Sequence, residues 1–561
     1  MQAVWKSVGL FSLTFLLVGF ILYPISSMVI GSLWVEGSLS FSRYADFFSL
    51  ESTSNLEALW NSVWVSLLTA FVSGFLGTGL AIVLSEFGLP GRRLLARVAV
   101  LPVALPPLVG VLAFFFLVGE GGILPRLVET LVGVRGGHLG IAGFSGVILV
   151  HTYVFYVYFY LFVSATLSRM DASLIEAAES LGSTRWHTLR KVVIPQLKPA
   201  LVGSTLLTFM MSMASFTAPL IFAADKRFLT LQIYNAKLNG DFGLAATQSV
   251  VLTAMAVGFL MFLRKAWGDL VFLGAAKGVP RPLRVKEISS GRVWQWSLSL
   301  FLGALLLLPI LTILLISVAQ EGSWASQVLP EKFTISNYAD LFARTDVFEP
   351  IVNSLFMSTL ATGAAVVLGL GIGYVSVRGG WRWGAKALEA TSLLPFAIPG
   401  TVLAINFILA FNTPTVFTAY RVLVGTFWIL PLAYVVRNLP LVVRSAIAGL
   451  QQADPSLEEA ASNLGAGSVR RLRRILLPVI LPSVVSGALL TFIACMGEFV
   501  MSIMLYTVVN RPISVEVFSQ LRLYNFGGAA AYSVILLFLI VVAVEISERV
   551  VGGSRVQVVQ F

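Results

Sequence analysis

Residues 176–195 read EAAESLGSTRWHTLRKVVIP, and residues 459–478 read EAASNLGAGSVRRLRRILLP. Both segments begin with Glu-Ala-Ala, continue to a glycine (Gly182 or Gly465) and end in a proline (Pro195 or Pro478) at identical spacing. Both are polar and basic, although the sequence around them is strongly apolar. A recurrence of this kind indicates an internal duplication.

The duplication extends over nearly the whole chain. The matching segments keep the same order in the two copies, and the first copy has a surplus of ten residues within 119–140, which we expect to form an outer loop. The further matches pair SRYADFF (42–48) with SNYADLF (336–342), NSVWVSLL (61–68) with NSLFMSTL (353–360), VLPVALPPLV (100–109) with LLPFAIPGTV (393–402), and DFGLAATQSVVL (241–252) with NFGGAAAYSVIL (525–536).

The composition predicts an all-α polytopic membrane protein. Of the 561 residues, 57% are hydrophobic and only 12% are charged, and the mean hydropathy is +0.89. A soluble core could not hide so much apolar surface, so lipid must cover most of it. The single cysteine, Cys495, excludes a disulfide within the chain, and His138, His151 and His187 lack the spacing of metal ligands. We therefore predict neither catalytic residues nor a metal site.

We expect about twelve membrane-spanning helices, because a helix needs roughly 20 apolar residues to cross a bilayer. Prolines interrupt the third, ninth and tenth of them, which we expect to be kinked or broken. The first follows Lys6 as a signal peptide would, but its apolar run is too long, so we expect a retained span. The twelve candidates lie near 8–31, 58–85, 96–118, 141–168, 199–224, 246–263, 294–318, 351–377, 388–411, 422–443, 480–506 and 529–547.

The positions of the basic residues predict the orientation in the membrane. With twelve spans and a cytoplasmic N-terminus, most of the 38 Lys and Arg fall in cytoplasmic segments. Both termini are then cytoplasmic, and the basic pI of 9.8 reflects topology rather than binding to nucleic acid. The two six-span repeats run in parallel. We expect one half at 1–265, a cytoplasmic linker at 266–292 and a second half at 293–561.

The two repeated segments each lie in the cytoplasmic loop between the fourth and fifth spans of their half. Asp171 and Asp454 stand where the N-cap of a helix would be, the glycine breaks this helix, and a second, basic helix leads into the next span. Amphipathic helices that lie on a membrane surface would account for the basic residues. They would not account for the recurrence of Glu-Ala-Ala, glycine and proline at the same spacing.

The repeated segment resembles the EAA loop of the membrane subunits of ABC importers, the permeases of binding-protein-dependent uptake systems. The resemblance implies that each copy is a coupling helix that docks in a cleft of an ATPase subunit. The matching positions are Glu176, Ala177, Ala178 and Gly182 in the first copy and Glu459, Ala460, Ala461 and Gly465 in the second.

The same resemblance implies a fused, two-half permease of the type I importer fold in a prokaryotic inner membrane. Its implied partners are two copies of a cytoplasmic ATPase and an extracytoplasmic substrate-binding protein. The outer loops at 36–57 and 321–349 are acidic by net charge and could meet such a protein, but ordinary solvated loops would have the same composition. The sequence contains no GxxxxGK[ST] motif, so we expect no ATP site and no enzymatic activity in this chain. ATP and Mg would be bound by the partner, and the chain itself would need no cofactor.

Glu498 is the one acidic residue placed well inside an apolar span rather than at its end. A charge at membrane depth costs at least ~2.5 kcal/mol, so it usually faces a cavity or a partner. One reading places Glu498 in the translocation pathway, with its repeat counterpart Ser215 on the other side. The other reading is structural: Glu498 caps a broken helix or pairs with a residue such as Arg437.

The substrate is less well determined than the machinery. The stretches at 437–466 and 497–499 most resemble ferric-iron permeases, whose relatives handle thiamine, aminoalkylphosphonates and polyamines. An ion-coupled secondary transporter also has two parallel six-span halves, but it would have more buried ionisable residues and no need for paired coupling loops. A membrane scaffold without transport activity would not need kinked central spans.

Overall fold

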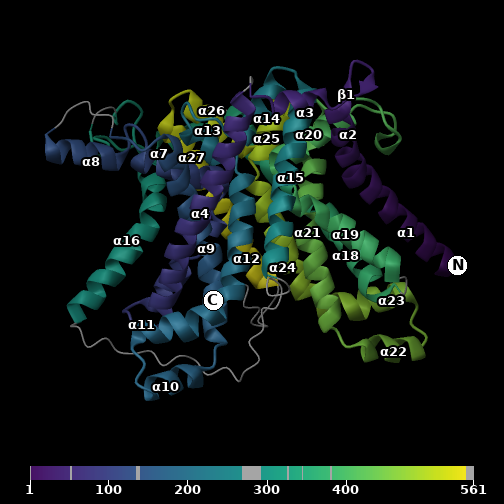
Figure 1. Cartoon of the computed structure of the whole chain (residues 1–561). Helices are drawn as coiled ribbons and strands as arrows, with labels where there is room; N and C mark the ends of the chain where they lie inside the picture. The colour runs from purple at the N-terminus through teal and green to yellow at the C-terminus, as the bar shows by residue number, and fades with distance from the viewer. Residues whose placement is uncertain are drawn as a thin grey trace. The chain divides into compact units, whose positions relative to one another are not determined.

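The computed structural model describes residues 2–50, 53–86, 88–133, 139–267, 292–324, 327–343, 345–379 and 382–550 (Figure 1). Nearly all of these residues are helical, which confirms the all-α class. The only strands in this part of the chain are β1 (Trp34–Val35) and β2 (Ser38–Leu39), a short antiparallel pair. The predicted linker at 266–292 falls mostly on 268–291, outside the described residues, and stays a prediction.

The predicted number of spans is confirmed. Among the described residues, eleven helical segments are long and apolar enough to cross a bilayer, and a bent helix pair brings the number to twelve. The eleven are Gly9–Leu33, Thr53–Ser85, Pro107–Val132, Gly143–Ser168, Trp186–Met213, Phe242–Leu263, Val293–Ser317, Val347–Arg378, Ile429–Gln452, Val469–Met496 and Phe526–Arg549, and the pair is Trp383–Ala397 with Gly400–Phe411.

Prolines break two spans at corresponding places in the repeats. In the second repeat, the chain bends by 113° between α19 (Arg382–Ala397) and α20 (Gly400–Phe411), at Pro399. In the first, the short helix α6 (Leu101–Ala104) ends before Pro106, and α7 (Pro107–Val118) begins directly after it. Proline lacks an N–H and disfavours helical backbone in the residue before it, so a helix ends there.

The tenth span differs from its predicted bounds. We expected 422–443 with a break at Pro431, whereas α21 runs unbroken from Ile429 to Gln452. Pro431 stands in its first turn, where the N–H of a residue has no helical partner in any case. Proline at that position therefore begins a helix rather than interrupting one.

The surplus segment of the first repeat contains a helix, although we expected a loop. This helix is α8 (Ile123–Val132), which follows α7. The guanidinium carbon of Arg126 lies 4.5 Å from the ring centroid of Trp324, and its Nη1 donates to the carbonyl of Gln327 at 2.9 Å. A cation–π contact and a hydrogen bond thus hold α8 to the segment that follows α16 (Arg292–Ser317).

The chain forms two compact units that cut across the sequence repeats. The predicted boundaries at 1–265 and 293–561 follow the repeat and stay a prediction. The first unit is formed by 2–49, 232–253 and 333–550 among the described residues, and the second by those within 50–231 and 254–332.

In the first unit, the initial span packs against helices of the second repeat. Gly19 lies so close to the ring of Phe417 that a β-carbon could not fit, and Phe20 and Tyr23 pack their rings on Phe411. The helices wholly within this unit are α1 (Gln2–Leu17), η1 (Val18–Leu22), α2 (Tyr23–Leu33), α3 (Ser42–Phe47), α17 (Ser336–Ala343), α18 (Thr345–Arg378), α19, α20, η4 (Val416–Thr418), α21, α22 (Pro455–Asn463), α23 (Ser468–Arg471), η5 (Leu472–Leu476), α24 (Leu477–Met496), α25 (Val500–Leu505), η6 (Val508–Asn510), α26 (Ile513–Arg522) and α27 (Phe526–Val550).

In the second unit, α16 closes the apolar core of the first repeat. The hydroxyl of Tyr153 donates to the carbonyl of Leu306 in α16 at 2.7 Å, and the hydroxyl of Tyr156 donates to the carbonyl of Ala99 at 2.8 Å. The remaining helices wholly within this unit are α4 (Thr53–Glu86), α5 (Arg92–Val98), α6, α7, α8, α9 (Gly143–Ser168), α10 (Ala172–Ser180), α11 (Arg185–Thr188), η2 (Leu189–Val193), α12 (Ile194–Met213) and α13 (Thr217–Phe222), whereas α14 (Leu229–Leu238) and α15 (Phe242–Trp267) begin in one unit and end in the other.

Candidate functional site

The first repeated loop is built around α10. Oδ1 of Asp171 accepts a hydrogen bond from the N–H of Ser173 at 2.9 Å, which satisfies one of the unpaired donors at the helix start. At the other end Gly182 has φ = +80°, and the next residue, Ser183, donates its N–H to the carbonyl of Ala178 at 3.0 Å. This is the glycine-terminated helix end that reverses the chain, and a side chain at Gly182 would strain it.

The second loop repeats this geometry around α22. Oδ1 of Asp454 accepts from the N–H of Ser456 at 2.9 Å, and hydrogen bonding from Ser456 lowers the pKa of this carboxyl group. Gly465 has φ = +79°, and Ala466 donates to the carbonyl of Ala461 at 2.9 Å. The caps and breaks predicted from the sequence are confirmed at both loops.

Each loop then enters the following span through a widened turn. The π-helical turns η2 and η5 stand immediately before α12 and α24, whose second residues are Pro195 and Pro478. Proline cannot donate the regular helical hydrogen bond, and such widened turns are a common response. The two prolines of the repeated motif thus fix the same entry into the membrane in both repeats.

The predicted coupling residues lie mainly on exposed surfaces. Glu176, Ala177, Glu459 and Ala460 are exposed, as are both glycines, whereas Ala178 is half-buried. Ala461 is buried. The exposed carboxylates and small side chains are therefore accessible from outside the chain.

Two leucines that we did not single out complete this surface. Leu181 is 88% exposed and Leu464 is 89% exposed, each immediately before the glycine of its loop. A single exposed apolar residue is ordinary on a protein surface, but the same residue at the same place in both loops marks a candidate contact position. The sequence did contain a signal, because Leu-Gly occurs at the same place in both copies.

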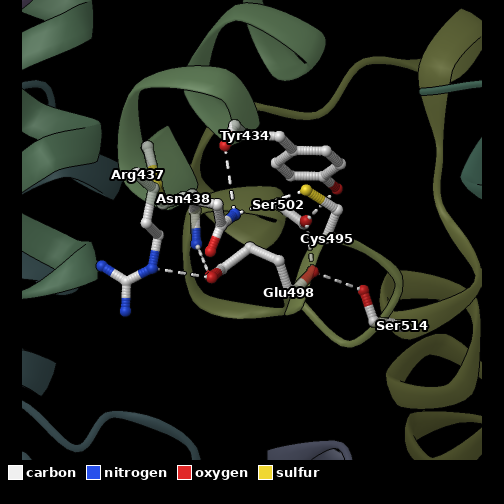
Figure 2. Close-up of polar contacts among 8 residues, drawn as sticks. Tyr434, Arg437, Asn438, Cys495, Glu498, Ser502 and Ser514 are labelled. Atoms are coloured by element: carbon white, nitrogen blue, oxygen red, sulfur yellow. Dashed lines mark hydrogen bonds and ion pairs between the residues drawn. The ribbon is translucent and has the colours of Figure 1, made fainter. Parts of the chain in front are cut away.

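Glu498 lies in the break between α24 and α25 (Figure 2). Its side chain is 9% exposed, and Oε2 pairs with Nε of Arg437 at 2.8 Å. Oε1 accepts from the N–H of Met501 at 3.0 Å, so the carboxylate also caps α25. Its backbone carbonyl accepts from the hydroxyls of Ser502 at 2.5 Å and Ser514 at 2.9 Å.

The ion pair belongs to a larger polar network that joins α21 to α24 and α25. The hydroxyls of Tyr434 and Ser502 are 2.6 Å apart. Asn438 donates to the carbonyl of Tyr434 at 3.0 Å and to Sγ of Cys495 at 3.3 Å. Figure 2 shows Arg437, Asn438 and Tyr434 meeting Glu498 and its neighbours from the facing helix. The network satisfies polar groups that would be costly to leave unpaired in an apolar interior.

Ser215 occupies the corresponding break between α12 and α13. Its hydroxyl lies 2.8 Å from Nε2 of His151, and Nδ1 of the same ring lies 3.1 Å from the hydroxyl of Ser212. The backbone carbonyl of Ser215 accepts a hydrogen bond from the hydroxyl of Thr230 at 2.8 Å. The break itself is alike in both repeats, since φ and ψ are −111° and −41° at Phe216 and −106° and −39° at Phe499.

The structure thus gives both Glu498 and Ser215 a structural partner set at equivalent helix breaks. The pathway role that we predicted for them stays a prediction. Among the described residues, no group of three or more His, Cys, Asp or Glu is placed to hold a metal ion.

Comparisons with known proteins place this geometry in context. A family model, "Binding-protein-dependent transport system inner membrane component", matches residues 58–274 and 365–551, once in each repeat. A probable ABC transporter permease protein of Sinorhizobium fredii is 29% identical over 92% of this chain and 91% of its own length. A ferric transport system permease protein of Actinobacillus pleuropneumoniae is 26% identical over 98% of this chain and 78% of its own length.

A second relative described as a putative ferric transport system permease protein comes from Haemophilus influenzae and is 28% identical over 88% of this chain and 76% of its own length. A solved bacterial ABC transporter involved in alginate import resembles 46% of this chain and 99% of its own chain, at 19% identity and a TM-score of 0.36. That structural likeness is too low to support an argument.

Proposed function

The chain belongs to the family of binding-protein-dependent transport system inner membrane components, and on this basis we propose that it imports ferric iron as the permease of an ATP-driven transporter. The observation that supports this proposal best is the pair of loops around α10 and α22. They have the same N-cap, the same left-handed glycine and the same exposed leucine. Such a pair is what two identical ATPase subunits would require.

In the mechanism that we propose, each loop docks on one copy of a cytoplasmic ATPase. The exposed Leu181 and Leu464 would enter apolar clefts, and Glu176 and Glu459 would make polar contacts at the rim. ATP and Mg would be held by the ATPase, since the chain has no P-loop motif, and the chain is not itself an enzyme. Closure of the ATPase pair would move the loops and change the side on which the pathway is open. Nucleotide can drive this only by binding one closure state better than the other.

Ferric iron is the substrate that the relatives favour. Two curated relatives matched over most of this chain are described as ferric transport permeases. Thiamine, aminoalkylphosphonates and polyamines were the alternatives within the same machinery, and the relatives do not favour them. Membership of the family also disfavours an ion-coupled secondary transporter.

We further propose that an external binding protein captures the iron and delivers it to the outer loops, and that both termini face the cytoplasm. The proposal agrees with the absence of a metal-ligand cluster among the described residues of this chain. Ferric iron prefers several hard oxygen ligands, which a separate binding protein would supply. The permease would then need only a translocation pathway that opens to one side of the membrane at a time, and no iron-binding ligands of its own.

The experiment that tests the function is uptake in proteoliposomes. The full chain would be reconstituted with its ATPase and the iron-loaded binding protein, and ATP-dependent entry of radioactive ferric iron would be measured. We expect uptake that requires all three components and is not reduced by excess thiamine or polyamine. Uptake of one of these solutes in place of iron would contradict the substrate assignment.

The coupling residues have their own test. Replacing Glu176 and Glu459 with alanine should weaken co-purification of the ATPase and lower substrate-stimulated ATP hydrolysis. Glu321→Gln, on an exposed segment after α16, is the control and should leave co-purification unchanged. If association and stimulated hydrolysis are both unchanged in the double variant, the coupling role of the glutamates is wrong.

A further inference from the structure

The second loop is attached to the spans by a residue that no repeat motif contains. Arg378, the last residue of α18, places Nε 2.7 Å from Oε1 of Glu458 in the first turn of α22. Its Nη2 also donates to the carbonyls of Leu450 at 3.2 Å and Ala453 at 3.1 Å. One guanidinium therefore joins the ends of α18 and α21 to the start of α22.

The chemistry of this contact suits a rigid connection. The carbonyl of Leu450 lies in the last turn of α21, where it has no helical donor, and that of Ala453 belongs to the C-cap residue that follows. The helix dipole favours a cation at this end. Only 20% of the Arg378 side chain and 13% of the Glu458 side chain are exposed, so water and salt screen the pair less than a surface pair. The planar, forked guanidinium can serve three acceptors at once, which a lysine could not do in the same geometry.

The sequence of the first repeat does not contain this pair of residues. By the register of the repeat, Arg378 corresponds to Glu86 and Glu458 to Ile175. Ile175 packs against the apolar core of the second unit instead. The first loop is therefore held at this position by an aliphatic side chain, whereas the second is held by an ion pair with additional hydrogen bonds.

Beneath each loop lies an apolar cluster built from corresponding positions of the two repeats. In the second repeat the cluster contains Leu450, Ala453, Leu472, Leu476 and Ile480, and in the first it contains Leu167, Met170, Leu189, Val193 and Leu197.

We propose that Arg378 and Glu458 are positioning residues that clamp α22 to the ends of α18 and α21. The proposal rests on the proposed function, because it treats α22 as a helix on which an ATPase acts. Movement of α22 is then transmitted directly to two spans.

The clamp can be tested on the full chain alone by hydrogen exchange in lipid nanodiscs. Glu458→Gln removes the charge while keeping the size of the side chain. We expect the amides of α22 to exchange about fivefold faster, because the helix opens locally more often. The amides of α10 should be unchanged. The control is Glu545→Gln, which breaks the exposed Arg549–Glu545 pair of α27 and should leave both helices unchanged.

Two outcomes of this measurement would overturn the clamp. Unchanged exchange in α22 would mean that the ion pair holds nothing, and equal acceleration in α10 and α22 would mean general loosening of the fold. Neither outcome depends on the ATPase, so failure of the clamp is distinguishable from failure of the proposed function.

A role in positioning also requires an effect on coupling. With the ATPase and binding protein present, Glu458→Gln should lower the amount of solute transported per ATP hydrolysed by about twofold or more, at normal ATPase association. Arg378→Lys should retain more of this ratio than Arg378→Met, because a lysine can still pair with Glu458. An unchanged ratio in Glu458→Gln together with faster exchange in α22 would show that the clamp is structural only and would overturn the proposal. Absence of any ATP-dependent uptake by the unmodified chain would instead contradict the proposed function.

Discussion

Single residues at the helix breaks show how this chain tolerates polar groups at membrane depth. Both carboxylate oxygens of Glu498 have partners within the chain: one forms an ion pair with Arg437 and the other caps α25. Ser215, at the equivalent break, meets the ring of His151 instead. The position is polar in both repeats, but the chemistry differs, which indicates that the break needs a polar partner and that its charge is specific to the second repeat.

Glu498→Gln separates the structural role from a role in the pathway. Glutamine can still accept from the N–H of Met501 but leaves Arg437 without a counter-charge, so we expect a loss of about 1–3 kcal/mol in stability. Thermal unfolding followed in detergent would measure it. Arg437→Met added to Glu498→Gln should recover part of the loss, since the half-buried charge of Arg437 is then removed and no longer lacks a partner.

A transport measurement tests whether Glu498 has a role in the pathway. If Glu498→Gln assembles normally and transports at the normal rate, Glu498 does not belong to the pathway. A clear fall in transport at normal assembly would support the pathway reading.

Gly465 offers a purely conformational test. Its φ of +79° is costly for any residue with a β-carbon, by about 1–2 kcal/mol for alanine. No heavy atom lies within 4 Å of where that carbon would stand, so sterics from neighbours cannot contribute. We expect Gly465→Ala to increase proteolytic cleavage within 463–468 severalfold.

Gly467→Ala is the matched control for this variant. Gly467 lies two residues away, has equally open space around it and is not among the residues with positive φ. Equal effects of the two substitutions would show that the left-handed backbone at Gly465 does not determine the stability of the loop.

At the level of helices, the sequence was informative wherever local chemistry determines the backbone. The N-caps Asp171 and Asp454, the glycine breaks and the proline-broken spans all follow from rules that act within a few residues. The tenth span was misplaced because Pro431 can either break a helix or begin one, and only its surroundings decide between these. The Arg378–Glu458 contact could not be predicted, because it joins positions 80 residues apart through tertiary packing.

The exposed leucines of the two loops predict where the ATPase binds. Leu464→Asp should leave the thermal stability of the chain within about 0.5 kcal/mol, because the side chain is in solvent, yet it should weaken ATPase co-purification strongly. Val508→Asp is the matched control, since Val508 is 90% exposed in η6, far along the chain from either loop. Equal effects of both substitutions on co-purification would indicate that added charge, rather than loss of a docking contact, is responsible.

At the scale of the whole chain, duplication explains why corresponding features recur with unequal chemistry. Each family match covers one repeat, while the compact units exchange a span: the initial helix lies in the unit of the second repeat and α16 in that of the first. The repeat could be recognised by eye from the sequence, because its motifs are local. The exchange of spans could not be recognised in this way, because the sequence of an apolar span does not indicate which neighbouring helices it packs against.

Two equal loops in one chain make a prediction about stoichiometry. If each loop binds one ATPase, native mass spectrometry of the complex should find two ATPase copies per chain. Leu181→Asp or Leu464→Asp alone should yield mainly complexes with one copy, and the double variant should yield none. Because the loops share their cap, turn and exposed leucine, we expect binding losses of similar size in the two single variants. Loss of both copies in either single variant would mean that the ATPase binds only as a preformed pair, and the two loops would then have to be treated as one site.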